Sequence, residues 1–279
     1  MLRMRKEFEL TCADGVKLFA RVWEAEEPKA ALCMAHGLGE HGDRYAHFAE
    51  FMNRHGITVY CHDHRGHGRN VKKSSDRGIA RMRDLERDFV TLIEYAKKET
   101  GLPVFLFGHS LGGLVGLFTT LNARPDVAGS IITSPWIKLA GGPPKALFDV
   151  VSAMAGLLTK VAISNGLSSA DLSHDKAVCD AYTPDPLNHD RIGLGLAGDA
   201  HRAAQWVLDN PDRLSVPLLL CHGAADHICD VSGSREFAQK NKSVRYVEFP
   251  NAFHEIHNEP EDADKLFAEE LAFIEGILG

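Results

Sequence analysis

The sequence predicts an α/β fold whose centre is a mostly parallel β-sheet with helices on both faces. Short apolar runs rich in β-branched and aromatic residues alternate with segments of helical periodicity along most of the chain. Parallel strands need crossover connections, which are usually helices, so this alternation indicates a parallel sheet that is covered on both sides. The alternation stops between residues 138 and 215, which indicates an insertion into the fold.

Eight strands are predicted for the sheet. The first two, FELTC (8–12) and VKLFARVWE (16–24), form a hairpin that turns at Asp14–Gly15. The other six are mostly apolar runs at residues 30–36, 57–63, 103–110, 128–135, 216–223 and 244–250. Helices are predicted between and after these strands, at residues 45–54, 82–98, 111–123, 231–240 and 261–277.

The insertion divides the sequence into three parts. Residues 1–137 form the first part of an α/β core, residues 138–215 a helical cap, and residues 216–279 the second part of the core. The cap opens with the turn-forming GGPP (141–144) and contains no convincing strand. Residues 146–163 are mostly apolar with helical spacing, which predicts a cap helix.

Composition and charge exclude several classes of protein. Hydrophobic residues make up 44% and charged residues 25% of the 279 residues, as in a soluble globular chain. The formal charge of −7 leaves no basic excess to neutralise phosphates, so nucleic acid is not an expected partner. No apolar stretch approaches 18 residues, and the basic N-terminus has no apolar segment typical of a signal peptide. Six scattered cysteines without an export signal favour the reducing cytoplasm.

The sharpest functional motif is Gly108-His109-Ser110-Leu111-Gly112, which matches the pattern G-x-S-x-G. It lies between a predicted strand and a predicted helix. This is the context of a nucleophile elbow, where a tight turn exposes a serine hydroxyl on strained backbone. Ser110 is therefore the candidate nucleophile.

A serine hydroxyl needs a base and a group that orients the base. Asp226 follows one late strand and His254 follows the next, so both are expected at the carboxyl edge of the sheet, where sites in α/β proteins are built. Asp230 is a competing acid and His257 a competing base. The residues alone give no strong preference between the two histidines.

An oxyanion hole would complete such a site. One backbone N–H comes from the residue after the serine, here Leu111, and the second from an earlier strand–helix loop. The run HGLGEH (36–41) directly follows a strand, so Leu38 N–H is the expected second donor. Candidates for holding this loop or for contacting a polar substrate group are Glu40, His41, Arg44 and His257.

The histidine-rich run CHDHRGHGRN (61–70) raises the alternative of a metallohydrolase, since imidazole and carboxylate are common zinc ligands. It comes within one residue of the H-x-H-x-D-H run of metallo-β-lactamase-type hydrolases. However, Gly66 stands where that pattern has its aspartate, and no second ligand cluster follows. Asp63, Arg65 and His67 are expected instead to hydrogen-bond to one another and to the 36–41 loop. No metal and no organic cofactor is predicted.

Several motifs together resemble the monoacylglycerol lipase and lysophospholipase branch of the α/β-hydrolases, which are serine aminopeptidase S33-like hydrolases. They are HGLGEHGDRY (36–45), HDHRGHG (62–68), GHSLGG (108–113), the cap segment at 172–189, HGAADHICD (222–230) and NAFHEIHNEP (251–260). The likeness covers nearly the whole chain, in order. It implies an α/β-hydrolase fold with an inserted helical cap. It also implies Ser110 as nucleophile, Asp226 as acid, His254 rather than His257 as base, and Leu38 and Leu111 as oxyanion donors.

The resemblance implies a serine hydrolase that cleaves the carboxylic ester of a monoacyl lipid, either a monoacylglycerol or a lysophospholipid, through an acyl-enzyme. The apolar stretch at 146–163 suits a long acyl chain, whereas the glycine-rich and charged run at 193–205 leaves a shorter chain open. Alternatives on the same fold are a short-chain carboxylesterase, a carbon–carbon bond hydrolase and a ligand receptor. The expected partner is a small amphiphilic ester, with transient membrane or micelle contact through the cap as a further hypothesis.

Overall fold

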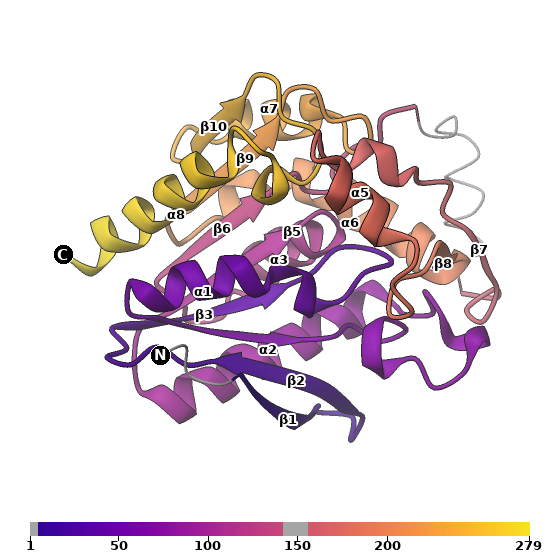
Figure 1. The fold of residues 1–279 in the computed structure, drawn as a ribbon, viewed down its shortest axis with the longest axis horizontal. Coiled ribbons are helices and arrows are strands. Elements are labelled where there is room, and N and C mark those ends of the chain that lie inside the picture. Colours follow the sequence, from indigo (N-terminus) through magenta and orange to yellow (C-terminus); the bar gives the residue numbers. More distant parts are fainter. Residues whose placement is uncertain (1–4, 142–155) are drawn as a thin grey trace.

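An eight-stranded sheet forms the centre of the computed structural model, which describes residues 5–141 and 156–279 (Figure 1). The strand order is β1-β2-β4-β3-β5-β6-β9-β10. β2 pairs antiparallel with β1 and β4, and every other pair in this sheet is parallel. The predicted mostly parallel sheet of eight strands is therefore confirmed. The strands are β1 Lys6–Thr11, β2 Lys17–Trp23, β3 Ala30–Ala35, β4 Ile57–His62, β5 Val104–His109, β6 Gly129–Thr133, β9 Leu218–Gly223 and β10 Arg245–Phe249.

Helices cover both faces of the sheet (Figure 1). α1 Ala46–Arg54 and α8 Ala263–Leu278 bury apolar side chains such as Phe48 and Phe273 against one face. On the other face lie α2 Met82–Thr100, α3 Leu111–Leu121, α6 Leu194–Asp209 and α7 Val231–Lys240. Burying one such side chain stabilises the fold by about 1.5–3 kcal/mol, so two apolar layers hold the sheet rigidly between them.

Glycines with a positive φ lie at the turn of the first hairpin and at the end of α2. The hairpin between β1 and β2 turns at Asp14–Gly15, where Gly15 has a φ of 80° and Cys12 N donates to Val16 O over 2.7 Å. Gly101 ends α2 in the left-handed conformation at a φ of 66°. Short 3₁₀ turns lie at Gly42–Tyr45, Gly68–Asn70, Ser74–Asp76, Ser169–Asp171, Pro211–Arg213 and Ile256–Asn258.

The inserted region contains strands that the sequence analysis did not predict. β7 Ala162–Ser164 and β8 Arg191–Gly193 form a separate two-stranded antiparallel sheet. In the sequence, α5 Lys176–Tyr182 lies between these two strands, and α6 directly follows β8. The expectation of a cap without strands is therefore wrong, because three-residue strands are too short to show alternation. Of the helix predicted at 146–163, residues 146–155 lie outside the described residues, residues 156–161 form turns and irregular backbone instead of a helix, and the last two belong to β7. The boundaries of the cap at 138 and 215 stay a prediction.

The glycine-rich run at 193–205 forms most of α6. Its small side chains let α6 approach α3 closely, and Ala200, Ala203 and Ala204 are buried there. Glycine disfavours a helix by about 1 kcal/mol relative to alanine, and this packing offsets that cost.

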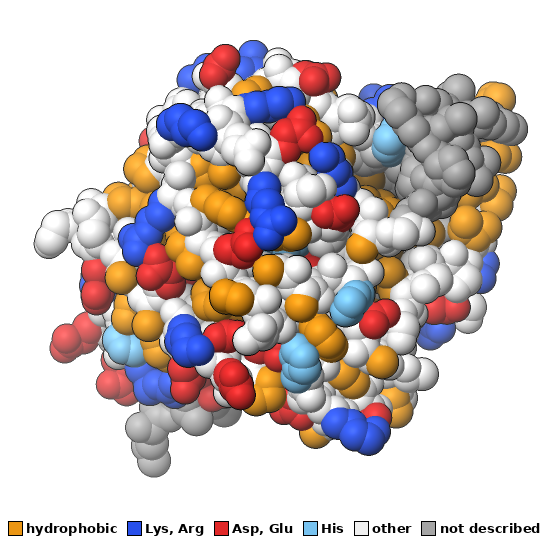
Figure 2. Space-filling model, turned by 90° about the horizontal axis from the view of Figure 1, so that it is seen from above, with side chains coloured by type: hydrophobic (Ala, Val, Ile, Leu, Met, Phe, Trp, Pro, Cys, Tyr) orange, Lys and Arg blue, Asp and Glu red, His pale blue; other side chains and the backbone are white. Residues whose placement is uncertain are grey.

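Exposed apolar side chains gather on one edge of the inserted region. Leu157 is 85% exposed, and Val161, Ile163 and Leu167 are also exposed. Figure 2 shows hydrophobic side chains along this edge of the molecule. Among residues 5–141 and 156–279, no helix has the length and apolar character that crossing a bilayer requires.

Candidate active site

Ser110 lies on strained backbone between β5 and α3. Its φ of 57° and ψ of −119° are unusual for a residue with a side chain, and such strain costs about 1–3 kcal/mol. The turn is tight because Gly108 and Gly112 flank it: a Cβ on Gly108 would overlap Gly112 O, and one on Gly112 would overlap Ala35 O. Ser110 N donates to Thr133 O over 3.1 Å, which fixes the turn to the neighbouring strand β6.

Asp226 and His254 are brought together by the loops after β9 and β10. His254 Nδ1 lies 2.7 Å from Asp226 Oδ2. The other carboxylate oxygen, Asp226 Oδ1, accepts from Ile228 N (2.8 Å) and Cys229 N (2.9 Å), which fixes the direction of the carboxylate.

Charge and burial act in opposite directions on this pair. Burial disfavours both charged forms, yet the positive charge of His254 and hydrogen bonds from His222 and His254 hold the pKa of Asp226 well below its ordinary value. Burial likewise opposes protonation of His254, but the Asp226 carboxylate raises the pKa of His254 above 6.5. The pair is therefore built to accept a proton on His254.

The competing residues from the sequence analysis have other contacts. Asp230 caps α7, where its Oδ1 accepts from Ser232 N over 2.8 Å. The His257 ring stacks on Tyr45 with ring centroids 4.7 Å apart, and burial lowers the pKa of His257 to about 3. Among the described residues, neither ring nitrogen of His257 has a hydrogen-bond partner.

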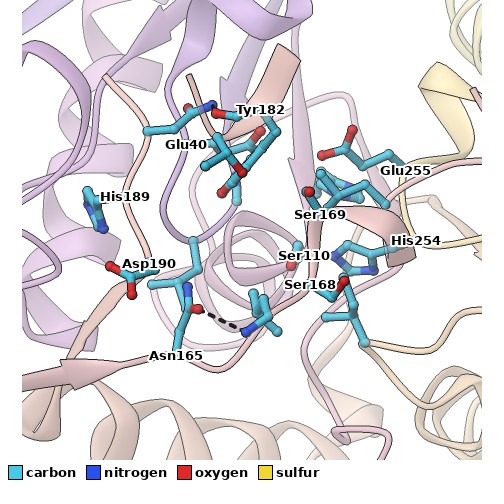
Figure 3. Close-up of a pocket in the computed structure, with 18 of the residues that line it drawn as sticks. Glu40, Ser110, Asn165, Ser168, Ser169, Tyr182, His189, Asp190, His254 and Glu255 are labelled. Atoms are coloured by element: carbon cyan, nitrogen blue, oxygen red, sulfur yellow. Dashed lines mark hydrogen bonds between the residues drawn. The ribbon is translucent and has the colours of Figure 1, made fainter. Parts of the chain in front are cut away.

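Two cavities meet at Ser110. A polar cavity of about 250 Å³ is lined by Ser110 and His254 together with polar side chains such as Glu40, Asn165 and Tyr182 (Figure 3). An apolar cavity of about 280 Å³ also reaches Ser110. Its lining includes Leu38, Trp136, Leu139, Ile192, Leu194, Ala197 and Cys229. The site therefore offers a more polar and an apolar compartment that both border Ser110.

The predicted oxyanion loop lies against the serine. A Cβ on Gly37 would be 3.3 Å from Ser110 Cβ, which shows how closely the loop approaches. Leu38 lines both cavities, and Leu111 is the first residue of α3. Gly37 N donates to Glu40 Oε1 over 2.5 Å, so the carboxylate of Glu40 holds the start of the loop.

Glu40, Arg44 and Glu255 form a buried network beside the polar cavity. Arg44 makes an ion pair with Glu40 and two hydrogen bonds of 2.6 and 2.8 Å with Glu255. Tyr45 Oη also donates to Glu40 Oε1 over 2.7 Å. Burial opposes ionisation of Glu255, yet Arg44 lowers the pKa of Glu255 to about 2. Glu40 and Arg44, two of the candidates for holding this loop, thus pair with each other, and both carboxylates also line the polar cavity.

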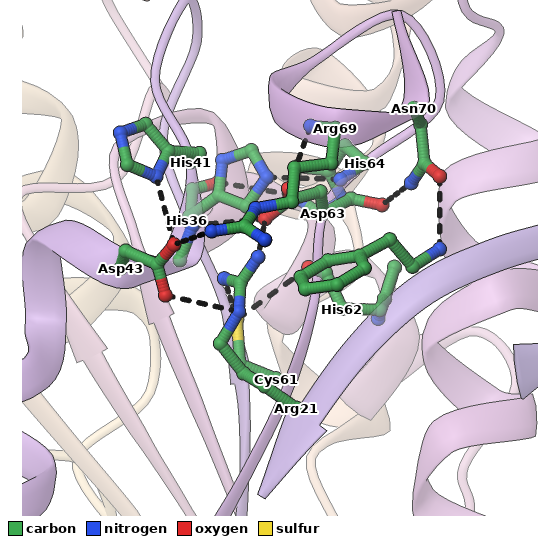
Figure 4. Close-up of polar contacts among 12 residues, drawn as sticks. Arg21, His36, His41, Asp43, Cys61, His62, Asp63, His64, Arg69 and Asn70 are labelled. Carbon is green, nitrogen blue, oxygen red and sulfur yellow. Dashed lines mark hydrogen bonds and ion pairs between the residues drawn. The ribbon is translucent and has the colours of Figure 1, made fainter. Parts of the chain in front are cut away.

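The histidine-rich run at the end of β4 is hydrogen-bonded to His36, the first residue of the oxyanion loop, by contacts between backbone and side-chain atoms (Figure 4). His64 N donates to His36 Nε2 over 2.9 Å, and His64 Nε2 lies 2.9 Å from His36 O. His67 Nδ1 lies 2.9 Å from Arg65 O. Within the described ranges, no three or more His, Cys, Asp or Glu side chains are grouped so as to hold a metal ion.

The predicted contacts within this run are partly wrong. Asp63 pairs with the buried Arg21 from β2 and accepts from Gly42 N over 3.1 Å. Arg65 pairs with Asp14 and Asp88 instead of with Asp63. The reason is that each side chain leaves the loop toward a different strand or helix, which local spacing does not reveal.

Sequence reasoning missed His222, which lies within β9 and is fully buried. Its Nε2 lies 3.2 Å from Asp226 Oδ2 and 3.0 Å from Cys229 O, while Nδ1 lies 2.7 Å from Ser234 Oγ. Cys229, one of the six scattered cysteines, is buried in the wall of the apolar cavity. Burial raises the pKa of the Cys229 thiol well above its ordinary value, so this thiol stays protonated.

A mostly parallel sheet with a serine at a strained strand–helix turn and a His–Asp pair at its carboxyl edge defines an α/β-hydrolase. Residues 26–261 match the family model described as serine aminopeptidase, S33, and the chain belongs to this family of hydrolases. Within the α/β-hydrolases it lies in the monoacylglycerol lipase branch, and it is an ester hydrolase.

Two lipases are similar to the chain over most of their length. The chain is 31% identical to a monoacylglycerol lipase of Mycolicibacterium smegmatis, over 92% of both chains. It is 33% identical to the human monoglyceride lipase, over 93% of this chain and 87% of the relative. An uncharacterised abhydrolase domain-containing protein of Dictyostelium discoideum is much longer, and the chain spans 27% of it at 33% identity.

A solved structure has the same fold. The monoacylglycerol lipase of Paleococcus ferrophilus superposes with a TM-score of 0.83 at 28% identity. The superposition covers 94% of this chain and 99% of that one.

Proposed function

We propose that the chain is a serine hydrolase that cleaves the carboxylic ester of a monoacylglycerol, with Ser110 as nucleophile, His254 as base and Asp226 as the acid that orients it. The observation that carries this proposal is the position of Ser110. It borders both the polar and the apolar cavity, and His254 lines the polar cavity with it. An ester of a fatty acid with a polyol has the same two-sided chemistry. The names of the relatives give independent support.

The reaction proceeds through an acyl-enzyme. His254 takes the proton of Ser110 Oγ as Oγ attacks the ester carbonyl carbon, and Asp226 stabilises the imidazolium that forms. The tetrahedral intermediate then expels the glycerol oxygen, which receives the proton from His254. Water, deprotonated by the same histidine, attacks the acyl-enzyme and releases the fatty acid with Ser110 restored.

The backbone N–H groups of Leu38 and Leu111 stabilise the negative oxygen of both tetrahedral intermediates. Loss of one such donor costs about 10²–10³ in kcat. This role is supported by the close approach of the 36–41 loop to Ser110.

The charge of the polar cavity favours glycerol over a phosphate-bearing head group. Glu40, Asp190 and Glu255 line the cavity together with Arg77, and Arg44 forms ion pairs with Glu40 and Glu255. Three carboxylates therefore stand against two guanidinium groups, and an added phosphate would meet this excess of negative charge, where like charges repel. Monoacylglycerol is therefore preferred to lysophospholipid.

The exposed apolar edge of the cap supports transient contact with a lipid surface. Leu157, Val161, Ile163 and Leu167 are exposed there, and three of the four lie within seven residues of one another. We expect the protein to co-sediment with neutral phosphatidylcholine vesicles, and the double substitution Leu157→Ser with Ile163→Ser to weaken this binding. Val16→Ser, which removes an exposed apolar side chain from the hairpin, is the matched control. Equal sedimentation of all three proteins would refute the membrane role of this edge.

The proposed activity is tested by turnover of substrates that share one acyl chain. We expect kcat/KM for monoacylglycerol to exceed that for lysophosphatidylcholine and lysophosphatidylglycerol, and Ser110→Ala to abolish all three activities. Turnover confined to acetate or butyrate esters would instead support a short-chain carboxylesterase. Absence of ester turnover in a protein that still binds monoacyl lipids would support a receptor or a carbon–carbon bond hydrolase.

A further inference from the structure

We propose that residues 182–189 of the cap are a positioning element for the oxyanion loop, and that Asp185 and Tyr182 hold the loop in its active shape. This inference rests on the proposed function, because it assigns a task to the loop that carries Leu38. It concerns a segment more than 140 residues away from that loop in the sequence.

The Gly39 carbonyl is the first point of contact. It accepts hydrogen bonds from His189 N over 2.8 Å and from Tyr182 Oη over 3.1 Å. Gly39 has a φ of 77°, and a Cβ at this position would overlap His189 O. The cap backbone therefore lies directly on the oxyanion loop, and glycine is required for the approach.

The His41 side chain is the second point of contact. His41 is buried, and its Nε2 lies 2.9 Å from Asp185 Oδ2. The other oxygen, Asp185 Oδ1, accepts from Leu187 N over 2.9 Å, which fixes the carboxylate within its own turn. The cap thus holds the loop by one backbone–backbone hydrogen bond, from His189 N, and by two contacts of its side chains, those of Tyr182 and Asp185.

Leu38 is fixed from both sides as a result. On its N-terminal side, Gly37 N is held by the Glu40 carboxylate. On its C-terminal side, the Gly39 carbonyl is held by the cap. The peptide plane that carries the Leu38 N–H lies between these two held groups, so their hydrogen bonds limit its rotation away from the reacting oxygen.

The cap segment is itself anchored to the core. His189 Nε2 lies 2.9 Å from Gly66 O, and Gly193 N donates to Gly78 O over 2.9 Å. The Arg44 guanidinium also lies 4.9 Å from the centre of the Tyr182 ring, a cation–π contact that ties α5 to the Glu40–Glu255 network. Residues 182–189 therefore act as a fixed support for the loop.

The test uses substitutions at Asp185 and a transition-state analogue. Asp185→Ala should lower kcat for monoacylglycerol about 10-fold, with KM within about twofold. The inhibition constant of an alkyl trifluoromethyl ketone, whose hemiketal oxygen occupies the oxyanion hole, should rise by the same factor as kcat/KM falls. The affinity for a non-hydrolysable 1-O-alkylglycerol ether should stay unchanged. Asp185→Asn, which keeps an amide able to bond His41 and Leu187 N, should recover most of the activity.

Asp180→Asn is the matched control. It breaks an exposed ion pair with Lys176 on α5 that does not touch the loop, and should leave all constants unchanged. Thermal unfolding of each variant checks folding. If Asp185→Ala does not fold, His41→Leu, which has no hydrogen-bonding group, breaks the same contact from the loop side.

Two results would overturn the proposal. One is an unchanged kcat and trifluoromethyl ketone affinity in a folded variant without the His41–Asp185 contact. The other is an equal loss of affinity for the ketone and the ether, which would indicate general damage to the substrate site. Failure of the proposed function itself would be visible separately, because the Ser110→Ala variant would then still hydrolyse the ester.

Discussion

His222 Nε2 lies 3.2 Å from Asp226 Oδ2, the same carboxylate oxygen that His254 Nδ1 approaches to 2.7 Å. The acid thus faces two histidines, and its other oxygen accepts two backbone N–H groups. Each additional donor draws negative charge away from the bond to His254. His222 therefore moderates how strongly Asp226 raises the pKa of the base.

We predict that His222→Leu moves the acid limb of the kcat/KM profile to higher pH. Without the second imidazole, the Asp226 charge acts more strongly on His254, so the pKa of His254 rises further and more of it is protonated at a given pH. The measurement is the pH profile for a p-nitrophenyl ester in a variant shown to be folded. His222→Gln keeps an N–H donor and should stay near the wild-type profile. A profile of His222→Leu that is unchanged or moves to lower pH would exclude this role.

Acyl-chain selectivity should respond to Ala197, which lies on α6 and lines the apolar cavity. Ala197→Phe fills part of that space and should lower kcat/KM for esters of twelve or more carbons about 10- to 100-fold. The kcat/KM for butyrate esters should change little, because each buried methylene contributes about 0.8 kcal/mol and a short acyl chain buries few methylenes in this cavity. The measurement is a chain-length series from two to sixteen carbons. Ala197→Ser, with nearly the native volume, is the control, and a uniform loss at all lengths would contradict the assignment of this cavity.

Glu270 should make the protein less stable as the pH rises. This residue of α8 is fully buried, and within the described part of the chain neither carboxylate oxygen has a hydrogen-bond partner. Burial raises its pKa well above 4.5. The pKa of Glu270 is therefore higher in the folded than in the unfolded state. Below the ordinary pKa the carboxyl is protonated in both states, and the free energy of unfolding decreases as the pH rises from there toward the pKa of the folded state.

We therefore expect Glu270→Leu to unfold at a higher temperature than the wild type at pH 8. The free energy of unfolding should increase by about 1–3 kcal/mol, and this increase should become smaller toward pH 5. Glu275→Gln, an exposed change on the same helix, serves as the comparison. A gain that does not depend on pH would mean that ionisation of Glu270 plays no part.

The buried histidine run should make the fold sensitive to acid. Burial lowers the pKa of His62 to about 4, whereas a histidine in the unfolded chain takes up its proton near 6.5. The folded state therefore loses stability as the pH falls from 6.5 toward 4. His62→Phe should reduce the loss of unfolding free energy at pH 5 by about 2 kcal/mol, measured by urea denaturation. His55→Gln, at the half-buried end of α1, is the control, and equal acid sensitivity of wild type and His62→Phe would contradict the prediction.

The sheet and the positions of the candidate triad could be predicted because local rules govern them. Alternating strands and helices imply parallel pairing, and parallel strands bring their carboxyl ends to one edge. Ser110, Asp226 and His254 each follow a different strand, so the topology alone brings them to that edge. The glycines around Ser110 further predict a tight turn, as found.

Contacts between distant segments could not be predicted in this way. Nothing local to Gly39 indicates that the backbone at His189 lies on it, and Arg65 finds its partners at Asp14 and Asp88 instead of within its own loop. The contact of His222 with Asp226 depends on Ser234 of α7, which fixes the imidazole ring. Such pairings follow from packing in three dimensions, where one sequence pattern is compatible with many partners.

The most direct test of the central claim is the site of covalent modification by a long-chain fluorophosphonate. Its phosphorus reacts with an activated serine and forms a stable tetrahedral adduct that resembles the first intermediate. The account predicts one adduct per chain in the intact mass spectrum, on the peptide that contains Ser110, with no adduct in Ser110→Ala and slower labelling while monoacylglycerol is present in excess. Absence of labelling in the folded wild-type protein, or an adduct on a residue other than Ser110, would contradict it.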